Sequence, residues 1–555
     1  MSETRDHAVV IGGSLAGLLA ARVLGDHFDR VTLVERDRFP GSPDYRPGIA
    51  QSRHLHVLWN RGLELIEGWF PGAEKDLLGA GAHDVGVPAD LLWLTSAGWR
   101  RRFEVTRLLT FSRGLLDWTI RTRLAADGRV RLLDGHEVAG LLASPGGDRI
   151  IGVEARERGS RSPVESLEAD LVVDATGRGS KTPEWLAGLG YPAPKQTLVD
   201  PLLGYASRYY AIPAGFDPGW KALYLQADAP RGTRTGALFP QEGDRWIVSL
   251  FGMGADYPPT DEKGFLEFAA SLRSPLLYEA IRDAEPLSPI VSYRRTANHR
   301  RHYERMRRWP GRYAVLGDAV CAFNPLYGQG MSVAAISAMT LDTCLRERAG
   351  LDEAARRFQR RVAKNAAGPW LIATGEDLRY GTTKGQKATV RTRVINRYVE
   401  RVVALANVDP RVCARMVNVL GLTAPPESLF LPDVLWRAAT KRARQPSGPD
   451  DLEGRQRPGD RRPRRRGLRL TIIGSRSADA LGDGVVAATA RVDPRPGEAA
   501  VAVAERPLEV RGGTAVAGPD GEGVAFELVG VVERAAVVTV VAGLDVVAGL
   551  GHQRS

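Results

Sequence analysis

Residues 9–17 read VVIGGSLAG, and the fold class of the chain can be inferred from this stretch. An apolar run ends in two glycines, and a segment of small, helix-forming residues follows. In a Gly-x-Gly-x-x-Gly turn, the first glycine permits the tight turn and the second lets the backbone approach a pyrophosphate. The third lets the helix pack closely on the strand. Gly12, Ser14 and Gly17 hold these positions, with Gly13 between the first two. A serine hydroxyl can itself donate to phosphate, so the departure at the second position is mild.

The segment that follows completes a βαβ unit. RVTLVERD (residues 30–37) reads as a second strand, and Glu35 ends it eighteen residues after Gly17. An acidic residue at this place holds a ribose hydroxyl in dinucleotide-binding folds. The pattern therefore predicts a Rossmann-like α/β domain that binds a dinucleotide. It does not decide between NAD and FAD.

A later stretch indicates a flavin. Residues 313–334 read YAVLGDAVCAFNPLYGQGMSVA, in which a buried strand delivers Asp318 and Pro325 follows in a loop. Gly328 and Gly330 then open a long helix. Asp318 can accept a hydrogen bond from a ribityl hydroxyl, and the helix start can direct N–H groups at the flavin edge that carries negative charge. The predicted cofactor is FAD.

Three motifs together resemble those of the FAD-dependent monooxygenase superfamily with the hydroxybenzoate-hydroxylase-like fold. They are the glycine-rich opening with Glu35, DLVVDATGRGS (residues 170–180) and the late GD…P…GQG motif, and they span residues 8–335. The resemblance implies these contacts to the ADP half of FAD: Gly12, Gly13, Ser14, Gly17, Glu35 and Arg36. It implies these along the ribityl chain and isoalloxazine: Asp318, Pro325, Gly328, Gly330 and Met331. Arg113 stands where the family often places a basic contact to FAD.

Departures from the aromatic hydroxylases favour a narrower match. Cys321 and Ser332 stand where many hydroxylases have His and Asn, and the middle motif reads Ala-Thr-Gly at residues 175–177. Five strings resemble the flavin epoxidases of polyether ionophore biosynthesis, the monensin and lasalocid type, over residues 7–435. They are RPGIAQSRHLHVLWNRG, LLGAGAHDVGVP, SRGLLDWTIR, DATGRGS and AFNPLYGQGMS. The resemblance implies epoxidation of polyketide alkenes through a flavin C4a-hydroperoxide, with O2 and with electrons from NAD(P)H or a partner reductase.

Other functions remain open at this point. A flavin-dependent hydroxylase of an aromatic or polyketide substrate has the same fold, and GALFP (residues 236–240) is similar to the pocket strand of prenyl-type FAD reductases. A flavin-free escort of prenylated proteins is the non-enzyme alternative. The Trp-x-Trp-x-Ile-Pro motif of tryptophan-type halogenases is absent from the sequence.

The chain divides into six predicted segments. The amino-acid composition changes near residue 440. Lys441 is the last lysine of the chain, and Phe526 is the only aromatic residue beyond residue 440. The tail is a small β module, a disordered segment or the product of a reading-frame error. The segments are the first part of the FAD-binding domain (1–195), the substrate sheet and helix (196–300), the return to the FAD-binding domain (301–345), a helical region (346–440), a basic linker (441–466) and the tail (467–555).

The flavin itself is the expected reactive group, so no catalytic side chain is assigned. The protein must keep the site dry and hold a hydrophobic polyene over the flavin. Candidate pocket residues lie in the expected antiparallel sheet, and core packing is the alternative role of most of them. They are Tyr205, Tyr209, Tyr210, Leu238, Phe239, Trp246 and Phe251.

Charge and cysteine content narrow the partners and the compartment. Of the net charge of +11, +6 lies in residues 441–466, which favours a solvated linker over a nucleic-acid surface. Three cysteines without close spacing fit a reducing cytoplasm. Asp545 interrupts the longest late apolar run, so we expect no membrane span. A flavin reductase or a carrier protein is a possible partner.

His54 and His56 raise the question of a metal site. On a strand their spacing would point both rings to one face, but no carboxylate or cysteine cluster accompanies them, so we expect no metal. The same alternation predicts that Arg53, Leu55 and Val57 face the other way. We expect Arg53 or one histidine edge to lie at the cofactor and the other histidine to be structural.

Overall fold

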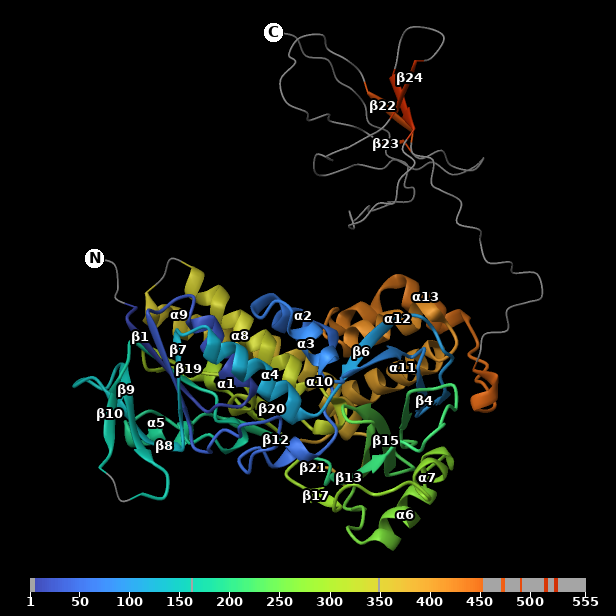
Figure 1. The fold of residues 1–555 in the computed structure, drawn as a ribbon, viewed down its shortest axis with the longest axis horizontal. Helices are drawn as coiled ribbons and strands as arrows, with labels where there is room; N and C mark the ends of the chain where they lie inside the picture. Colours follow the sequence, from blue (N-terminus) through green and yellow to red (C-terminus); the bar gives the residue numbers. More distant parts are fainter. Residues whose placement is uncertain are drawn as a thin grey trace. The chain divides into compact units, whose positions relative to one another are not determined.

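The computed structural model describes residues 5–160, 163–347 and 350–452, and four short strands beyond residue 470. It divides into two units, residues 1–454 and 455–555. In the first unit a parallel five-stranded sheet has the order β19-β11-β1-β2-β7 (Figure 1). Because both faces are covered, β1 reads as a continuous apolar run and is buried along its length. The bounds are β1 (His7–Ile11), β2 (Arg30–Glu35), β7 (Val130–Asp134), β11 (Leu171–Asp174) and β19 (Tyr313–Val315).

Three helices pack around this sheet. The helix that follows the glycine-rich turn, α1 (Leu15–Leu24), lies against α8 (Gly330–Arg346) and α4 (Arg113–Ala126). Its buried residues are small or aliphatic, which allows the close approach of helix and sheet. The βαβ unit predicted from residues 9–37 is therefore present, with α8 packed on α1 although some three hundred residues separate them in the sequence.

A second, seven-stranded sheet has the order β17-β13-β16-β15-β14-β4-β5. Its central strands are antiparallel, as expected for the substrate region, whereas β14 pairs with β4 in parallel. The strands β4 and β5 come from residues 91–99, inside the segment predicted to belong to the FAD-binding domain. Its bounds are β4 (Leu91–Thr95), β5 (Gly98–Trp99), β13 (Gly204–Ala211), β14 (Ala222–Leu225), β15 (Arg234–Gln241), β16 (Arg245–Gly252) and β17 (Val291–Tyr293).

The two faces of this second sheet have different partners. Tyr210, Leu238 and Trp246 belong to one face and pack in a core cluster with residues of α6 (Glu262–Ala270) and α7 (Leu276–Ile281). Residues of the opposite face, such as Tyr205, Phe239 and Phe251, pack in a cluster that includes the C-terminal helices. The alternation of side chains along each strand thus separates a structural face from a face that is free to line a site.

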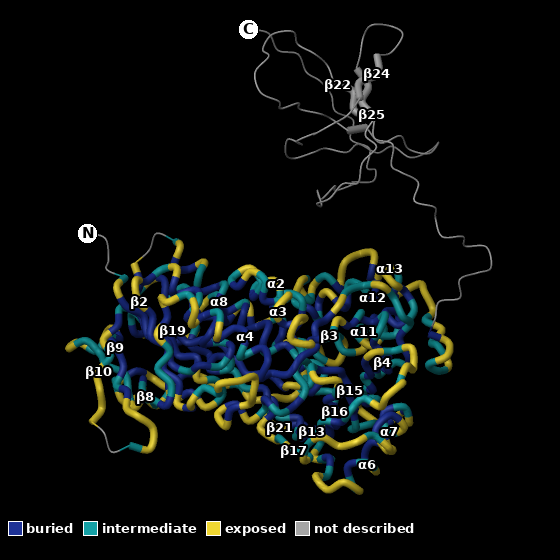
Figure 2. Tube along the Cα trace, in the orientation of Figure 1, coloured by how far each residue is buried: buried dark blue, intermediate teal, exposed yellow. Residues whose placement is uncertain are grey.

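The region after residue 350 is mainly helical, as predicted. Figure 2 shows dark, buried chain concentrated in the two sheets and along the inner sides of the helices. The helices are α9 (Leu351–Asn365), α10 (Ala367–Asp377), α11 (Val390–Ala406), α12 (Pro410–Leu420) and α13 (Pro432–Thr440). The other elements are α2 (Asn60–Trp69), α3 (Ala73–Gly79), β3 (His83–Val87), β6 (Thr106–Thr110), β8 (His136–Ala143), β9 (Ile150–Glu157), β10 (Glu165–Glu168), α5 (Thr182–Gly188), β12 (Gln196–Asp200), β18 (Asn298–Arg301), β20 (Cys321–Ala322) and β21 (Lys384–Gly385).

The start of the predicted linker is ordered against the first unit. Gln445 Oε1 accepts from Asn407 Nδ2 at 2.9 Å, and Leu452 is fully buried. Residues 441–452, at the start of the predicted linker, therefore belong to the first unit, and single contacts of this kind cannot be recognised in a segment of basic composition. The remainder of the linker lies outside the described residues.

In the second unit the structure describes one antiparallel sheet of four short strands: β22 (Thr471–Gly474), β23 (Ala490–Arg491), β24 (Thr514–Ala517) and β25 (Val524–Glu527). The rest of the predicted tail lies outside the described residues. Within the part of the chain that the structure describes, no helix combines the length and the apolar character needed to cross a membrane.

Candidate cofactor and substrate site

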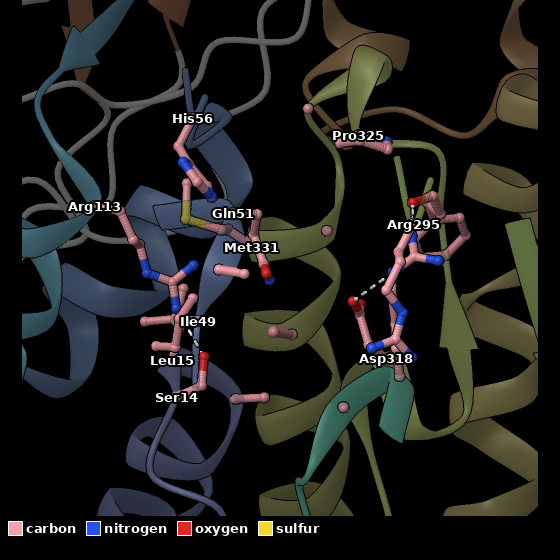
Figure 3. A pocket seen from close by; sticks show the side chains of 18 of the residues that line it. Ser14, Leu15, Ile49, Gln51, His56, Arg113, Arg295, Asp318, Pro325 and Met331 are labelled. Atoms are coloured by element: carbon pink, nitrogen blue, oxygen red, sulfur yellow. Dashed lines mark hydrogen bonds and ion pairs between the residues drawn. The ribbon is translucent and has the colours of Figure 1, made fainter. Parts of the chain in front are cut away.

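One cavity of about 630 Å³ runs through the first unit from the glycine-rich turn to the seven-stranded sheet. Most predicted FAD contacts line it, and they come from three separate parts of the sequence. They are Gly12, Ser14, Glu35, Arg36, Arg113, Asp318, Pro325, Gly328, Gly330 and Met331. In Figure 3, Ser14, Arg113, Gln51 and Met331 lie on one wall, and Asp318, Arg295 and Pro325 lie on the other.

Gly13 and Gly17 do not line this cavity, yet both shape its turn. The backbone N–H of Gly13 donates to Glu35 Oε2 at 2.6 Å, which ties the turn to the end of β2. A Cβ atom on Gly17 would lie 1.8 Å from the carbonyl oxygen of Gly12, which itself has φ +98°. The glycines are therefore required by the backbone geometry, which brings the start of α1 up to the cavity.

Glu35 is held in a fixed position at the ADP end. Its Oε1 accepts from the Asp37 N–H at 2.9 Å, and its Oε2 lies 3.2 Å from Arg46 Nη1. Arg46 is 4% exposed and also donates from Nη2 to the Gly13 carbonyl at 2.7 Å. Sequence reasoning did not assign Arg46, because a single arginine in a loop has no recognisable signal. The arrangement orients the Glu35 carboxylate beside the cavity, where a ribose hydroxyl can donate to it.

Arg113 connects α4 to the start of α1. Its Nη2 donates to Ser14 Oγ at 2.9 Å and its Nε donates to Asp117 Oδ1 at 2.8 Å, while the side chain is buried. Ser14 caps α1 without a hydrogen bond from its side chain to the helix backbone. A cation, a hydroxyl and the positive end of a helix thus meet at one point, which is the chemistry that an anionic pyrophosphate requires.

At the other end of the cavity, the lining includes Asp318, which follows β19, and Gly330, which begins α8. Burial raises the pKa of the Asp318 carboxyl, while the guanidinium groups of Arg178, Arg113 and Arg301 oppose that rise. Arg178 Nε lies 3.7 Å from Asp318 Oδ2. Gly328 has φ +65°, which lets the chain reverse between Pro325 and the first turn of α8. Gly330 has open space around its Cα, so a flat ring can approach the helix start closely.

The two histidines lie against the site but form no metal centre. His54 Nδ1 is 2.8 Å from Ser207 Oγ, and burial lowers its pKa to about 3. His56 lines the cavity, donates from Nδ1 to the His54 carbonyl at 2.9 Å, and has its pKa lowered to about 4 by burial and by Arg113. Both rings are therefore neutral near pH 7. Among the described residues, no three His, Cys, Asp or Glu side chains gather as a metal site would need.

The alternation predicted around these histidines is wrong. Residues 50–53 form a short 3-10 helix and the chain after it is irregular, so the period of two does not apply. Leu55, His56 and Val57 all line the cavity. Arg53, predicted as a cofactor contact, is not among the cavity-lining residues, and its guanidinium instead stacks 3.5 Å above the ring of Tyr45.

The far end of the cavity is aromatic and aliphatic. Of the seven pocket candidates, Tyr205, Phe239 and Phe251 line it. Tyr210, Leu238 and Trp246 pack on the opposite face of the sheet, and Tyr209 lies beneath Arg245 outside the lining. The structure adds wall residues that the sequence did not indicate, most of them from outside residues 196–300. These are Trp59, Leu91, Trp93, Leu108, Tyr224, Tyr293 and Leu420.

The sequence profile of the family described as "FAD binding domain" matches residues 5–353. The chain belongs to this FAD-binding family. Its cofactor is FAD, and the cavity fits the cofactor because anion-binding groups, an acidic ribose contact and an open helix start follow one another along it. The curated protein Rv3254 of Mycobacterium tuberculosis (strain ATCC 25618 / H37Rv) is 32% identical over 421 residues, which cover 73% of this chain and 87% of that protein.

Further relatives of this FAD-binding protein are oxidoreductases. Kynurenine 3-monooxygenase of Salinispora arenicola (strain CNS-205) is 27% identical over 373 residues, 62% of this chain and 73% of that protein. The structure of the flavin-dependent brominase Bmp2 has a TM-score of 0.57 at 15% identity, covering 79% of this chain and 100% of that chain. PqsL of P. aeruginosa in complex with 2-aminobenzoylacetate gives 0.51 at 18% identity, covering 67% and 98%. The two structures share the fold of this chain.

Replacing Arg113 with methionine is expected to weaken FAD binding by 10- to 100-fold. The change removes a charge-assisted hydrogen bond at the anion-binding point, and such bonds contribute about 1.5–3 kcal/mol. FAD affinity can be measured by flavin fluorescence after reconstitution. The control is Arg121→Met, which removes an equally buried guanidinium from the same helix, where it binds the Pro40 carbonyl and does not line the cavity. Equal losses in both variants would show that Arg113 acts only through the packing of α4.

Proposed function

We propose that the protein is an FAD-dependent monooxygenase that epoxidises alkenes of a long, hydrophobic polyketide. The main support for this proposal is the composition of the cavity wall formed by the seven-stranded sheet and α12. Trp93, Phe239, Phe251 and Leu420 present apolar surface there. The polar side chains of the strands in this wall are phenols and an indole. Gln226 and Arg295, which follow β14 and β17, also line the cavity, and Arg295 is exposed. This wall suits a neutral, elongated substrate.

The phenols in this wall are hydrogen-bond donors and not bases. Burial raises the pKa of Tyr224 to about 12 and raises those of Tyr205 and Tyr293 as well. They remain protonated at neutral pH. Hydroxylation of a phenol benefits from a base that ionises the substrate, whereas an alkene has no proton to remove. A wall whose phenols stay protonated therefore supports epoxidation over hydroxylation.

The balance of the proposed reaction is simple. One alkene, O2, NAD(P)H and a proton give an epoxide, water and NAD(P)+, and bound FAD supplies the oxygen activation. The chain's own contribution is to hold the alkene in the apolar half of the cavity and to exclude water from it. His56 and Arg113, on the wall opposite Asp318 and Pro325, keep the cofactor half polar.

The proposal predicts a mass gain of one oxygen atom for each alkene oxidised. The FAD-loaded protein would be incubated with a linear polyene, NADPH and a flavin reductase, and the products analysed by mass spectrometry. Saturated product would instead identify a prenyl-type reductase, and oxygen added to an aromatic substrate with no reaction of the polyene would identify a hydroxylase. A purified protein that takes up no FAD would leave only the flavin-free escort function.

Two matched variants test the position of the substrate. Phe239→Gln introduces an amide into the apolar wall and is expected to lower kcat/KM at least tenfold, as about 1.4 kcal/mol corresponds to a factor of ten. Tyr209→Gln makes the same change on the same face of the sheet but outside the cavity lining. It should leave kcat/KM within twofold. The visible FAD spectrum reports that both variants retain the cofactor.

A further inference from the structure

The outer side of the C-terminal helical region carries an unusual set of exposed apolar side chains. Of the twelve large apolar side chains exposed among the described residues, seven lie between residues 371 and 436. Trp436 on α13 is 61% exposed, and Val390 and Val394 on α11 are 68% and 63% exposed. The others in this region are Leu371, Phe430, Leu431 and Leu435. Such a concentration on a folded protein marks an interaction surface.

The first half of α11 combines these apolar side chains with positive charge. At 100° per residue, Val390, Val394, Arg391, Arg393 and Arg397 fall on one face of about 160°, with the valines between the arginines. All five are exposed. Among the described residues, none of the three guanidinium groups has a hydrogen-bond or ion-pair partner. The opposite side of α11 is anchored to the protein, for Asn396 Nδ2 donates to the Gly375 carbonyl at 2.9 Å.

The charge of this segment is one-sided. Residues 381–399 contain Lys384, Lys387 and the three arginines, and no acidic residue. Two acidic groups of α11 and α13 have partners, since Glu400 accepts from Arg379 at 2.6 Å and Asp433 lies 3.4 Å from Arg415. Glu427, which precedes Phe430, is exposed, so three arginines stand against one exposed carboxylate. The free charge on this face is therefore positive.

Two contacts fix α13 and the segment before it against α11. The ring of Tyr398 stacks on Phe430 with centroids 4.8 Å apart, and Arg401 donates to the Ala438 carbonyl at 3.0 Å. Phe430 precedes α13, which exposes Leu435 and Trp436. Figure 1 shows α11 and α13 at the same end of the first unit. We call this set (Val390, Val394, Phe430, Leu431, Leu435 and Trp436 with Arg391, Arg393 and Arg397) the α11/α13 surface.

We propose that the α11/α13 surface docks the protein on an anionic lipid bilayer. Proteins that bind the headgroup region of a bilayer expose apolar side chains beside cationic ones. The apolar groups (here Trp, Leu, Phe and Val) insert between the lipids, and the cations (here unpaired Arg) bind lipid phosphates. A second copy of the chain does not suit this surface, because the like-charged arginines of two copies would meet. Docking does not depend on which substrate is oxidised.

The position of this surface relative to the cavity indicates a role for the docking. Leu420 of α12 lines the cavity, and Val402 and Leu405 of α11 pack in the core cluster behind it. The same helical layer therefore lies over the apolar end of the cavity and exposes the lipid-compatible surface on its outer side. A hydrophobic substrate that partitions into a bilayer would be concentrated next to the enzyme.

Vesicle sedimentation tests the proposal on the FAD-loaded, full-length protein. Binding is expected to vesicles of equal parts phosphatidylcholine and phosphatidylglycerol, to weaken with rising salt, and to be slight with phosphatidylcholine alone. The triple variant R391Q/R393Q/R397Q should lose about 100-fold in affinity, because each cation near an anionic surface contributes about fivefold. The control R231Q/R282Q/R305Q removes three exposed arginines elsewhere, with side chains 82%, 53% and 62% exposed, and should bind as the wild type does.

Insertion of the apolar side chains has a separate readout. Lipids brominated in their acyl chains should quench part of the tryptophan fluorescence, and that part should disappear in W436F while the charge-dependent binding remains. Absence of vesicle binding, equal binding to neutral and anionic vesicles, or equal losses in the two triple variants would overturn the proposal. So would a concentration-dependent dimer that only R391Q/R393Q/R397Q abolishes, since the surface would then be an interface between copies. The visible FAD spectrum confirms that each variant is folded.

Discussion

Replacing Gly17 with alanine is expected to yield a protein without bound FAD. A Cβ atom at this position would lie 1.8 Å from the carbonyl oxygen and 3.0 Å from the carbonyl carbon of Gly12. The clash is with backbone and not with the end of a flexible side chain, so either α1 or the turn must move. Both movements displace Ser14 and the N-terminal N–H groups of α1 from the place where they meet Arg113. We expect a loss of FAD affinity of more than 100-fold, measured by flavin fluorescence and by the cofactor content after purification.

Gly25, at the other end of the same helix, provides the matched control. It has φ −60°, and its Cβ would come no closer than 3.4 Å to a neighbour, the carbonyl oxygen of Arg22. Alanine is compatible with that backbone and should stabilise the protein by about 0.4–1 kcal/mol by restricting the unfolded chain. Normal FAD content in Gly17→Ala, or equal loss in both variants, would contradict the role assigned to the third glycine of the turn.

The parts of the site that the sequence predicts are those in which local geometry imposes a residue type. Gly12 needs a positive φ, Gly17 needs the absence of a side chain, and Asp318 comes three residues after the buried strand β19. These requirements appear as a pattern within about twenty residues. The parallel sheet and the FAD-binding family could therefore be predicted from residues 9–37 and 313–334.

The substrate end of the cavity could be predicted only in part, because it depends on pairing between distant segments. Trp93 reaches the wall because β4 pairs in parallel with β14, more than one hundred residues later in the sequence. Tyr210 and Phe239 look alike in the sequence, but only the strand register assigns one to the core and the other to the cavity. Arg53 was predicted from a strand-like alternation that a 3-10 helix replaces. Such errors arise wherever tertiary contacts decide which side of the chain faces the site.

The buried carboxyl of Asp377 is expected to lower the stability of the protein as the pH rises from 4 to 7, and Asp377→Asn should remove that contribution. Asp377 ends α10 and is fully buried behind the loop of Pro325. Its carboxylate accepts hydrogen bonds from Asn298 Nδ2 at 2.6 Å, Asn324 Nδ2 at 2.9 Å and the Tyr327 hydroxyl at 2.7 Å. All three donors are neutral, and among the described residues no cation lies within ion-pair distance.

Burial therefore outweighs the hydrogen bonds and raises the pKa of Asp377 from 3.8 to about 7, with a smaller contribution from the nearby charge of Glu376. The folded protein holds this proton more tightly than the unfolded chain. The free energy of unfolding is then highest below pH 4, declines between pH 4 and pH 7, and becomes constant above pH 7. At about 1.4 kcal/mol for each pKa unit, the decline attributable to Asp377 is about 4 kcal/mol. Other titrating groups add their own slopes, which is why the comparison must be made between variants.

Urea unfolding of the wild type and Asp377→Asn between pH 4.5 and pH 8.5 isolates this contribution. Relative to the wild type, the variant should gain stability as the pH rises to about 7, and the difference should then stay constant. Glu376→Gln is the control, because the neighbouring carboxylate is partly exposed and has Arg379 at 3.0 Å. It should keep most of the slope, which falls only by the smaller contribution that the Glu376 charge makes to the raised pKa of Asp377. Since Asn324 and Tyr327 flank Pro325 at the flavin end of the cavity, FAD retention should follow the same pH dependence. Parallel stability curves for wild type and Asp377→Asn would show that a cation or water compensates the buried charge.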